Sequence, residues 1–157
     1  MKPTLPGLFL GAILSLGLLP AAQAEVHDID QLIDLNAMTP EEVYRFDPSY
    51  LWIEEGDSVR FLNSTGNHTV TALEGMWPEG AELVNIEHAP EAVISFDRPG
   101  IYGFRCKVHG RHGMYALVVV GMPEPNIDQI DFSKVSTPGR ALLEQLLAEM
   151  QRDRVTR

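Results

Sequence analysis

The chain has 157 residues, 45% of them hydrophobic and 22% charged, a composition that suits one compact globular domain rather than a disordered or multidomain protein. Its 22 acidic and 12 basic side chains give a net charge of −10, which argues against nucleic-acid binding through a basic surface. A single cysteine excludes an intrachain disulfide and a four-cysteine zinc or iron–sulfur centre.

The N-terminal segment has the pattern of a secretory signal peptide. Lys2 precedes an apolar run from Leu8 to Leu19, and the small residues Ala22 and Ala24 form a cleavage site. The apolar run is shorter than the roughly 20 residues that cross a bilayer, so we expect cleavage after Ala24 rather than a membrane anchor. The chain then divides into a signal peptide (1–24), a β domain (25–122) and a C-terminal helical extension (123–157).

Short β-rich segments recur between residues 50 and 120. Several alternate apolar and polar side chains, as half-buried strands do, and turn sequences containing glycine or proline separate them. Regular short strands of this kind indicate a β-sandwich. The predicted strands are Tyr50–Ile53, Ser58–Leu62, His68–Thr71, Ala92–Phe96, Ile101–Phe104 and Met114–Val120.

The pattern becomes helical after Pro125. We expect a short helix over residues 126–134 and a longer one with Thr137 as its N-cap and Pro138 in its first turn. The apolar residues of the longer helix fall on one face and should pack on the sandwich, although a partner-binding helix is the alternative. These residues are Leu142, Leu143, Leu146, Leu147 and Met150.

A loop between two predicted strands contains Cys106, His109 and Met114. An unpaired thiol is a liability in an exported protein, because it oxidises or cross-links. We therefore expect another group to be bound to the Cys106 sulfur. The alternative is a buried free cysteine that acts as a small hydrophobic residue. Thiolate, imidazole and thioether donors together select copper over hard cations, and the neighbouring residues therefore favour a metal site.

One ligand is missing from this loop and must come from an earlier part of the chain. The upstream histidines are His27, His68 and His88. His68 begins a predicted strand after a turn, where a rigid sheet could hold it. His68 is therefore a candidate for the missing ligand, beside Cys106, His109 and Met114. Two histidines, one cysteine and a weak axial methionine are typical of blue-copper electron-transfer proteins.

His112 and Tyr44 are further residues of interest near this loop. His112 could be an exposed neighbour of the site, a pH-dependent neighbour of the copper, or a ligand of another metal together with Cys106 and His109. Its spacing is awkward for ligation once Met114 is present, which favours the exposed neighbour. Tyr44 could lie over the His109 ring or serve only in packing.

The chain resembles the pseudoazurins, which are small periplasmic cupredoxins. The motifs that carry the resemblance are Phe46–Leu51, Glu55–Val59, His68, Gly75–Ala81, Pro99–Tyr102 and Cys106-x-x-His109 with Met114. It implies an eight-stranded Greek-key sandwich with two C-terminal helices. It also implies one type 1 copper near one end, bound by His68, Cys106, His109 and Met114.

The resemblance also implies a function. The chain would be a periplasmic monomer, not an enzyme, and would carry single electrons from a cytochrome-type donor to a reductase such as copper nitrite reductase. It would bind no nucleic acid and would not insert stably in a membrane. The rival functions are copper storage or delivery, which a single cysteine and a single axial methionine disfavour, and a metalloenzyme, for which a four-ligand site leaves little room.

Three features beside the ligands distinguish this chain. Val108 stands where pseudoazurins commonly have proline, and we hypothesise that its N–H donates to the Cys106 sulfur and raises the reduction potential. Thr69 replaces the usual asparagine, which puts the customary link between the ligand loops in question. A positive patch could steer partners, although ordinary solvated charge is the alternative. The patch consists of Arg105, Lys107 and Arg111.

Overall fold

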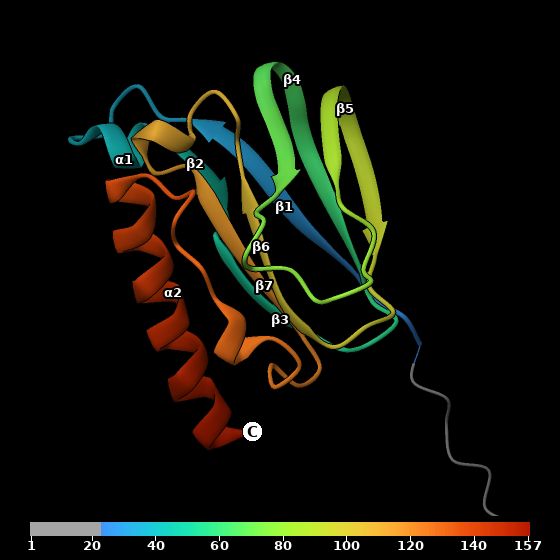
Figure 1. Ribbon diagram of the computed structural model, residues 1–157. Helices are drawn as coiled ribbons and strands as arrows, with labels where there is room; N and C mark the ends of the chain where they lie inside the picture. The colour runs from blue at the N-terminus through green and yellow to red at the C-terminus, as the bar shows by residue number, and fades with distance from the viewer. Residues whose placement is uncertain (1–22) are drawn as a thin grey trace, which may run out of the picture.

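The computed structural model describes residues 23–157 (Figure 1). The predicted signal peptide, up to Ala22, lies outside the described residues. No helix in the described part of the chain is long and apolar enough to cross a membrane. The elements in chain order are β1 (Val26–Ile33), α1 (Pro40–Val43), β2 (Tyr44–Asp47), β3 (Tyr50–Ile53), β4 (Ser58–Ala72), β5 (Asn85–Ser95), β6 (Gly100–Arg105), η1 (Gly110–His112), β7 (Tyr115–Val120), η2 (Ile127–Gln129) and α2 (Thr137–Thr156).

The strands hydrogen-bond in the order β2-β1-β4-β6-β7-β3, and β5 pairs with β4. β1 runs parallel to β4 and β3 runs parallel to β7, whereas the other pairs are antiparallel. The register of β4 shifts between Ser64 and Thr69, so its first half pairs with β1 and β5 and its second half with β5 and β6. β4 thus contributes to both layers, and the expected sandwich is confirmed. Its described strands number seven, or eight when the two halves of β4 are counted separately.

β7 is buried on both of its faces, which explains its unbroken apolar sequence. Its even-numbered residues, such as Val118, lie in the core between the layers with Phe61 and Phe104. Its odd-numbered residues, such as Leu117, lie in a second core on the outer side of the sheet. Because side chains alternate along a strand, one run of six apolar residues joins the two cores.

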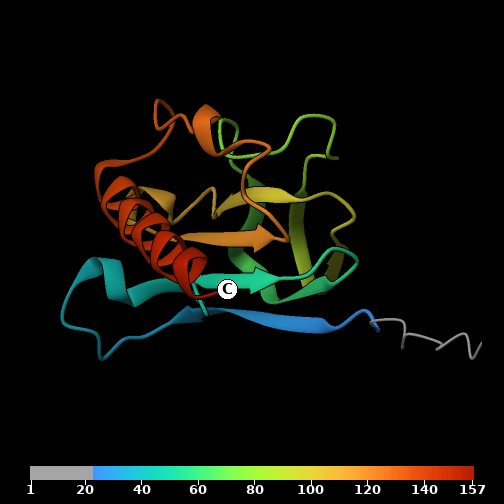
Figure 2. The same cartoon turned by 90° about the horizontal axis from the view of Figure 1, so that it is seen from below.

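Helix α2 covers the second core. Leu143, Leu146 and Met150 are buried against β7, and Figure 2 shows the helix lying along the outer side of β7 and β3. The predicted apolar face therefore packs on the sandwich. Gly139 makes this packing close, because a Cβ there would lie 2.1 Å from the Tyr115 ring.

Two details of the predicted helices are wrong. Residues 126–134 do not form an α-helix but only the single turn η2, because tertiary partners take the polar groups that a helix would need. The Asn126 side chain bonds both the N–H and the carbonyl of Ile101, and the Asp131 N–H donates to the Gly75 carbonyl. The N-cap of α2 is Ser136, not Thr137; its backbone is extended and its hydroxyl accepts a bond from the Gly139 N–H.

Candidate metal centre

The loop between β6 and β7, which carries three of the four predicted ligands, lies at the end of the sandwich that is at the top in Figure 1. His68 lies in β4, within the stretch where the register of that strand shifts. Cys106 directly follows β6, His109 directly precedes η1, and Met114 directly precedes β7. Two adjacent antiparallel strands therefore hold the two ends of the loop, and a third strand supplies the distant histidine.

Three of the predicted ligands come together as a compact donor set. The donor atoms of His68, Cys106 and His109 all lie within 4.8 Å of one another, and all three residues are buried. The Cys106 Sγ is 3.6 Å from the His109 Nδ1, and the two imidazole rings have centroids 4.9 Å apart. A thiolate and two imidazoles at this separation can bind one soft or borderline metal ion together.

His68 is buried without a hydrogen-bond partner on either ring nitrogen. Only 6% of its surface is exposed, and an unpartnered buried polar atom costs about 1–3 kcal/mol. Burial lowers the pKa of His68 below its ordinary value, which favours the neutral imidazole that a metal requires. The donor set fits copper, because a metal ion would bind one of these two nitrogens.

His109 is similarly prepared to act as a neutral ligand. Burial lowers its pKa, and the electrostatic influence of the neighbouring His68, His112 and Arg111 side chains lowers it further. Tyr44 covers its ring face, with centroids 4.0 Å apart and planes 4° from parallel. The structure thus agrees with the stacked position for Tyr44.

Backbone hydrogen bonds close the loop tightly around these residues. The Gly110 N–H donates to the Cys106 carbonyl at 2.8 Å, and the Cys106 N–H donates to the Met114 carbonyl at 3.1 Å. The Met114 N–H in turn donates to the His109 carbonyl at 3.3 Å. The Met114 side chain is fully buried in the same core cluster as Cys106. The loop is therefore held in one conformation by its own backbone.

The surroundings of the Cys106 sulfur differ from the expectation. Neither the Val108 N–H nor another described backbone N–H donates to it, so the proposed effect of Val108 on the potential loses its basis. The Thr69 hydroxyl lies 3.9 Å from the sulfur and accepts a bond from the Lys107 N–H at 2.9 Å. Thr69 therefore links the two ligand segments, and the concern raised by the missing asparagine is removed.

The charges beside the loop are partly neutralised. Lys107 forms an ion pair with Glu87, and Arg111 donates to the His112 ring at 2.9 Å. His112 is half-buried and lies outside the group formed by His68, Cys106 and His109. The expected positive patch is therefore weaker than three free charges, and Arg111 is its main exposed contributor.

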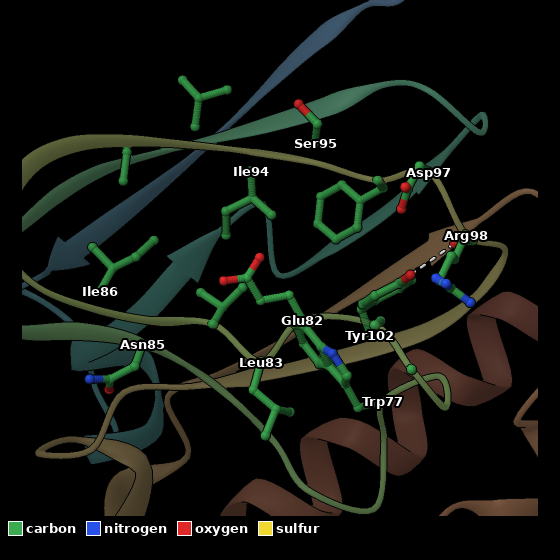
Figure 3. A pocket seen from close by; sticks show the side chains of 16 residues that line it. Trp77, Glu82, Leu83, Asn85, Ile86, Ile94, Ser95, Asp97, Arg98 and Tyr102 are labelled. Atoms are coloured by element: carbon green, nitrogen blue, oxygen red, sulfur yellow. Dashed lines mark hydrogen bonds between the residues drawn. The ribbon is translucent and has the colours of Figure 1, made fainter.

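A groove of about 810 Å³ lies elsewhere on the sandwich, between residues 80–86 and residues 92–98 (Figure 3). Ile86, Ile94 and Tyr102 line it, and the Tyr102 hydroxyl donates to the Arg98 carbonyl at 2.9 Å. None of the four predicted ligands lines this groove. The groove is therefore separate from the buried donor set.

Sequence reasoning missed the support that β1 gives to the site. Gln31, which is buried on β1, accepts bonds from the Ser64 N–H and hydroxyl and donates to the Thr69 carbonyl at 3.1 Å when its amide is oriented to suit these neighbours. These bonds anchor β4 on both sides of the segment that carries His68. A buried glutamine in an alternating segment is a detectable signal, but the acidic residues of β1 obscured the strand.

Comparisons with known proteins agree with this geometry. Residues 34–121 match the family described as copper binding proteins, plastocyanin/azurin family. The chain is 35% identical over 133 residues to the pseudoazurin of Methylorubrum extorquens, covering 85% of this chain and 86% of that protein.

Solved structures extend the similarity to the fold. A crystal structure of pseudoazurin from Methylobacterium extorquens AM1 matches with a TM-score of 0.70 and 32% identity, covering 80% of this chain and 98% of that one. Pseudoazurin from Hyphomicrobium denitrificans matches with a TM-score of 0.69 and 28% identity, covering 79% of this chain and 97% of that one. The similarity therefore spans most of the described chain.

Proposed function

The chain belongs to the plastocyanin/azurin family of copper-binding proteins, and to the pseudoazurins within it, and from this premise we propose that it is a carrier of single electrons. The observation that carries the proposal is the buried group of His68, Cys106 and His109, in which both nitrogens of His68 lack partners. Burying such a group is costly without a metal, and a metal ion would bind one of the two His68 nitrogens.

We propose that His68, Cys106 and His109 would hold one copper ion and that Met114 would be a fourth, weaker ligand. Copper when bound supplies a one-electron couple whose potential depends on the axial ligand and on the surroundings of the thiolate. Thr69 and Tyr44 fix those surroundings, because the first lies against the sulfur and the second covers the His109 ring. The closed backbone of the loop limits rearrangement of the ligands when an electron enters or leaves.

Burial of the ligands supports a carrier over the two rival functions. His68 and His109 are 6% and 7% exposed, so neither a substrate nor an acceptor for transferred metal has open access to them. A metalloenzyme needs an open coordination position, and a delivery protein needs ligands that exchange. We therefore propose that the protein has no catalytic activity of its own.

The proposed setting is the periplasm, with a cytochrome-type donor and a reductase such as copper nitrite reductase as the acceptor. Export with cleavage after Ala24 agrees with one feature of the fold. The Glu25 N–H lies 2.8 Å from a carboxylate oxygen of Asp57, so cleavage would place a positively charged α-amino group against a negative charge.

Optical titration of the purified protein with copper(II) tests the proposal. We expect one copper per chain, an intense visible band from the copper–thiolate bond, and a reversible one-electron wave in voltammetry. Cys106→Ser should lose the band because a hydroxyl does not replace the thiolate. A wild-type protein that stays colourless, or a Cys106→Ser variant that stays blue, would contradict the proposed site.

A further inference from the structure

The first turn of helix α2 touches the proposed ligand loop, and we propose that Ser136 is a positioning residue for the copper site. In Figure 1 the upper end of α2 lies beside the short turn η1, which directly follows His109. This inference rests on the proposed function, because it concerns how the same loop is held.

A single hydroxyl makes two hydrogen bonds at this contact. The Ser136 Oγ donates to the Gly110 carbonyl at 2.7 Å and accepts from the Gly139 N–H at 3.2 Å. The first bond holds the residue next to His109, and the second caps the helix. Because a hydroxyl has one donor and two acceptor positions, both bonds form together.

A second contact brings the same helical turn against the residue that follows Met114. Gly139 packs directly against the Tyr115 ring, where a Cβ at position 139 would lie 2.1 Å from a ring carbon. The Tyr115 hydroxyl accepts a bond from the Ser136 N–H at 3.3 Å. The helix therefore contacts the neighbours of two proposed ligands, one at each end of the segment from His109 to Met114.

These contacts tie the loop to a helix that is itself anchored far from the metal site. Leu143, Leu146 and Met150 bury the remaining turns of α2 against the sheet. The loop is therefore held from outside by a rigid element as well as from inside by its own hydrogen bonds. Ser136 acts through Gly110, and it positions His109 without touching the metal.

Three substitutions at one position separate this role from helix capping. Ser136→Ala removes both bonds. Ser136→Asp keeps a preferred capping acceptor but, as an ionised carboxylate, cannot donate to Gly110. Ser136→Thr keeps the hydroxyl and both bonds, and is the matched control.

The first measurement is amide hydrogen exchange by NMR in the metal-free proteins. The Gly113 N–H donates to the same Gly110 carbonyl at 3.0 Å and reports on opening of the loop. We expect exchange about fivefold faster in Ser136→Ala and Ser136→Asp, the factor expected when one ordinary hydrogen bond is lost. Ser136→Thr should exchange like the wild type.

The second measurement is the rate of copper(I) release to a competing chelator, which should rise in the same two variants. Wild-type exchange in Ser136→Asp would overturn the inference, because the bond to Gly110 would then be unnecessary. Unchanged release in both variants would also overturn it. A wild-type protein that binds no copper would contradict the proposed function, while the exchange experiment would still decide whether Ser136 holds the loop.

Discussion

The two ends of the sandwich differ in the hydrogen-bond partners that they give to a histidine. At one end, His68 is buried and neither ring nitrogen has a partner. At the other end, His27 lies 3.1 Å from Asp57, whose carboxylate also accepts bonds from the Glu25 and Glu54 N–H groups. The second cluster is complete without any further component, whereas the first is not.

This difference indicates which polar cluster serves structure and which serves function. A buried group that is fully hydrogen-bonded contributes to folding. Removing one member leaves the other polar atoms buried without partners, which lowers the stability of the fold. A buried group with missing partners weakens the metal-free fold and is retained for what it binds. The contrast between His68 and Asp57 can be tested directly by substitution.

The largest effect is expected from His68→Phe, which removes a ligand and two unpartnered nitrogens. Copper affinity should fall by at least about 100-fold and the visible band should disappear. The metal-free protein should become more stable by about 1 kcal/mol, because the buried polar atoms no longer need partners. Copper titration and urea unfolding measure the two effects, and a metal-free variant less stable than the wild type would break the comparison.

The opposite result is expected from Asp57→Asn at the other end. The carboxylate accepts three bonds, and its side chain is only 9% exposed, so its loss should cost about 2 kcal/mol of unfolding free energy. The copper spectrum should stay unchanged, because the substitution lies at the far end of the sandwich. Urea unfolding and the optical spectrum of the loaded variant provide the check.

Acid should remove the contribution of Asp57, and comparison with Asp57→Asn isolates this part of the acid effect. Hydrogen bonds, foremost from the Glu25 N–H, hold the pKa of Asp57 below its ordinary value, so at acidic pH the unfolded chain binds a proton before the folded protein does. Its contribution to stability is complete above about pH 4 and disappears as the pH falls through the lower folded pKa. The unfolding free energies of the metal-free wild type and Asp57→Asn, measured between pH 6 and pH 2, should therefore converge at the acidic end. A difference in unfolding free energy that stays constant over this range would contradict the role given to Asp57.

A moderate effect is expected at Tyr44, which stacks on His109. Tyr44→Leu should destabilise the loaded protein by about 1 kcal/mol, because it removes a parallel aromatic contact. Tyr44→Phe keeps the ring and serves as the matched control. Thermal unfolding of both variants measures the effect, and equal stability of Tyr44→Leu and Tyr44→Phe would show that the stacking contributes nothing.

The smallest effect concerns the charges near the ligand loop. Arg111→Gln should reduce the ionic-strength dependence of electron transfer by about twofold, because this charge is exposed. Lys107→Gln should change it less, since Glu87 already neutralises that side chain. Stopped-flow rates at several salt concentrations distinguish the two, and a larger effect at Lys107 would contradict the pairing.

Much of the fold could be predicted from local sequence patterns. Tyr50–Ile53 is a strand with the predicted bounds, and the apolar run that ends at Val120 is β7. By contrast, β1 was missed, because the acidic residues among its exposed positions hide the alternation that buries Ile29 and Gln31. The short helix predicted over residues 126–134 failed because its polar groups bond to β6 and to Gly75.

The sequence by itself predicted the proposed ligand loop, because Cys106, His109 and Met114 are close along the chain and their donor types favour copper. It also made His68 a candidate for the distant ligand, because that residue begins a predicted strand, and the resemblance to the pseudoazurins implied the full set. Only the tertiary structure decided that Thr69 links the two ligand segments, that Glu87 neutralises Lys107, and that Ser136 reaches Gly110. Those contacts join residues 20 to 38 positions apart, and they depend on strand register and on helix packing, which local spacing does not encode.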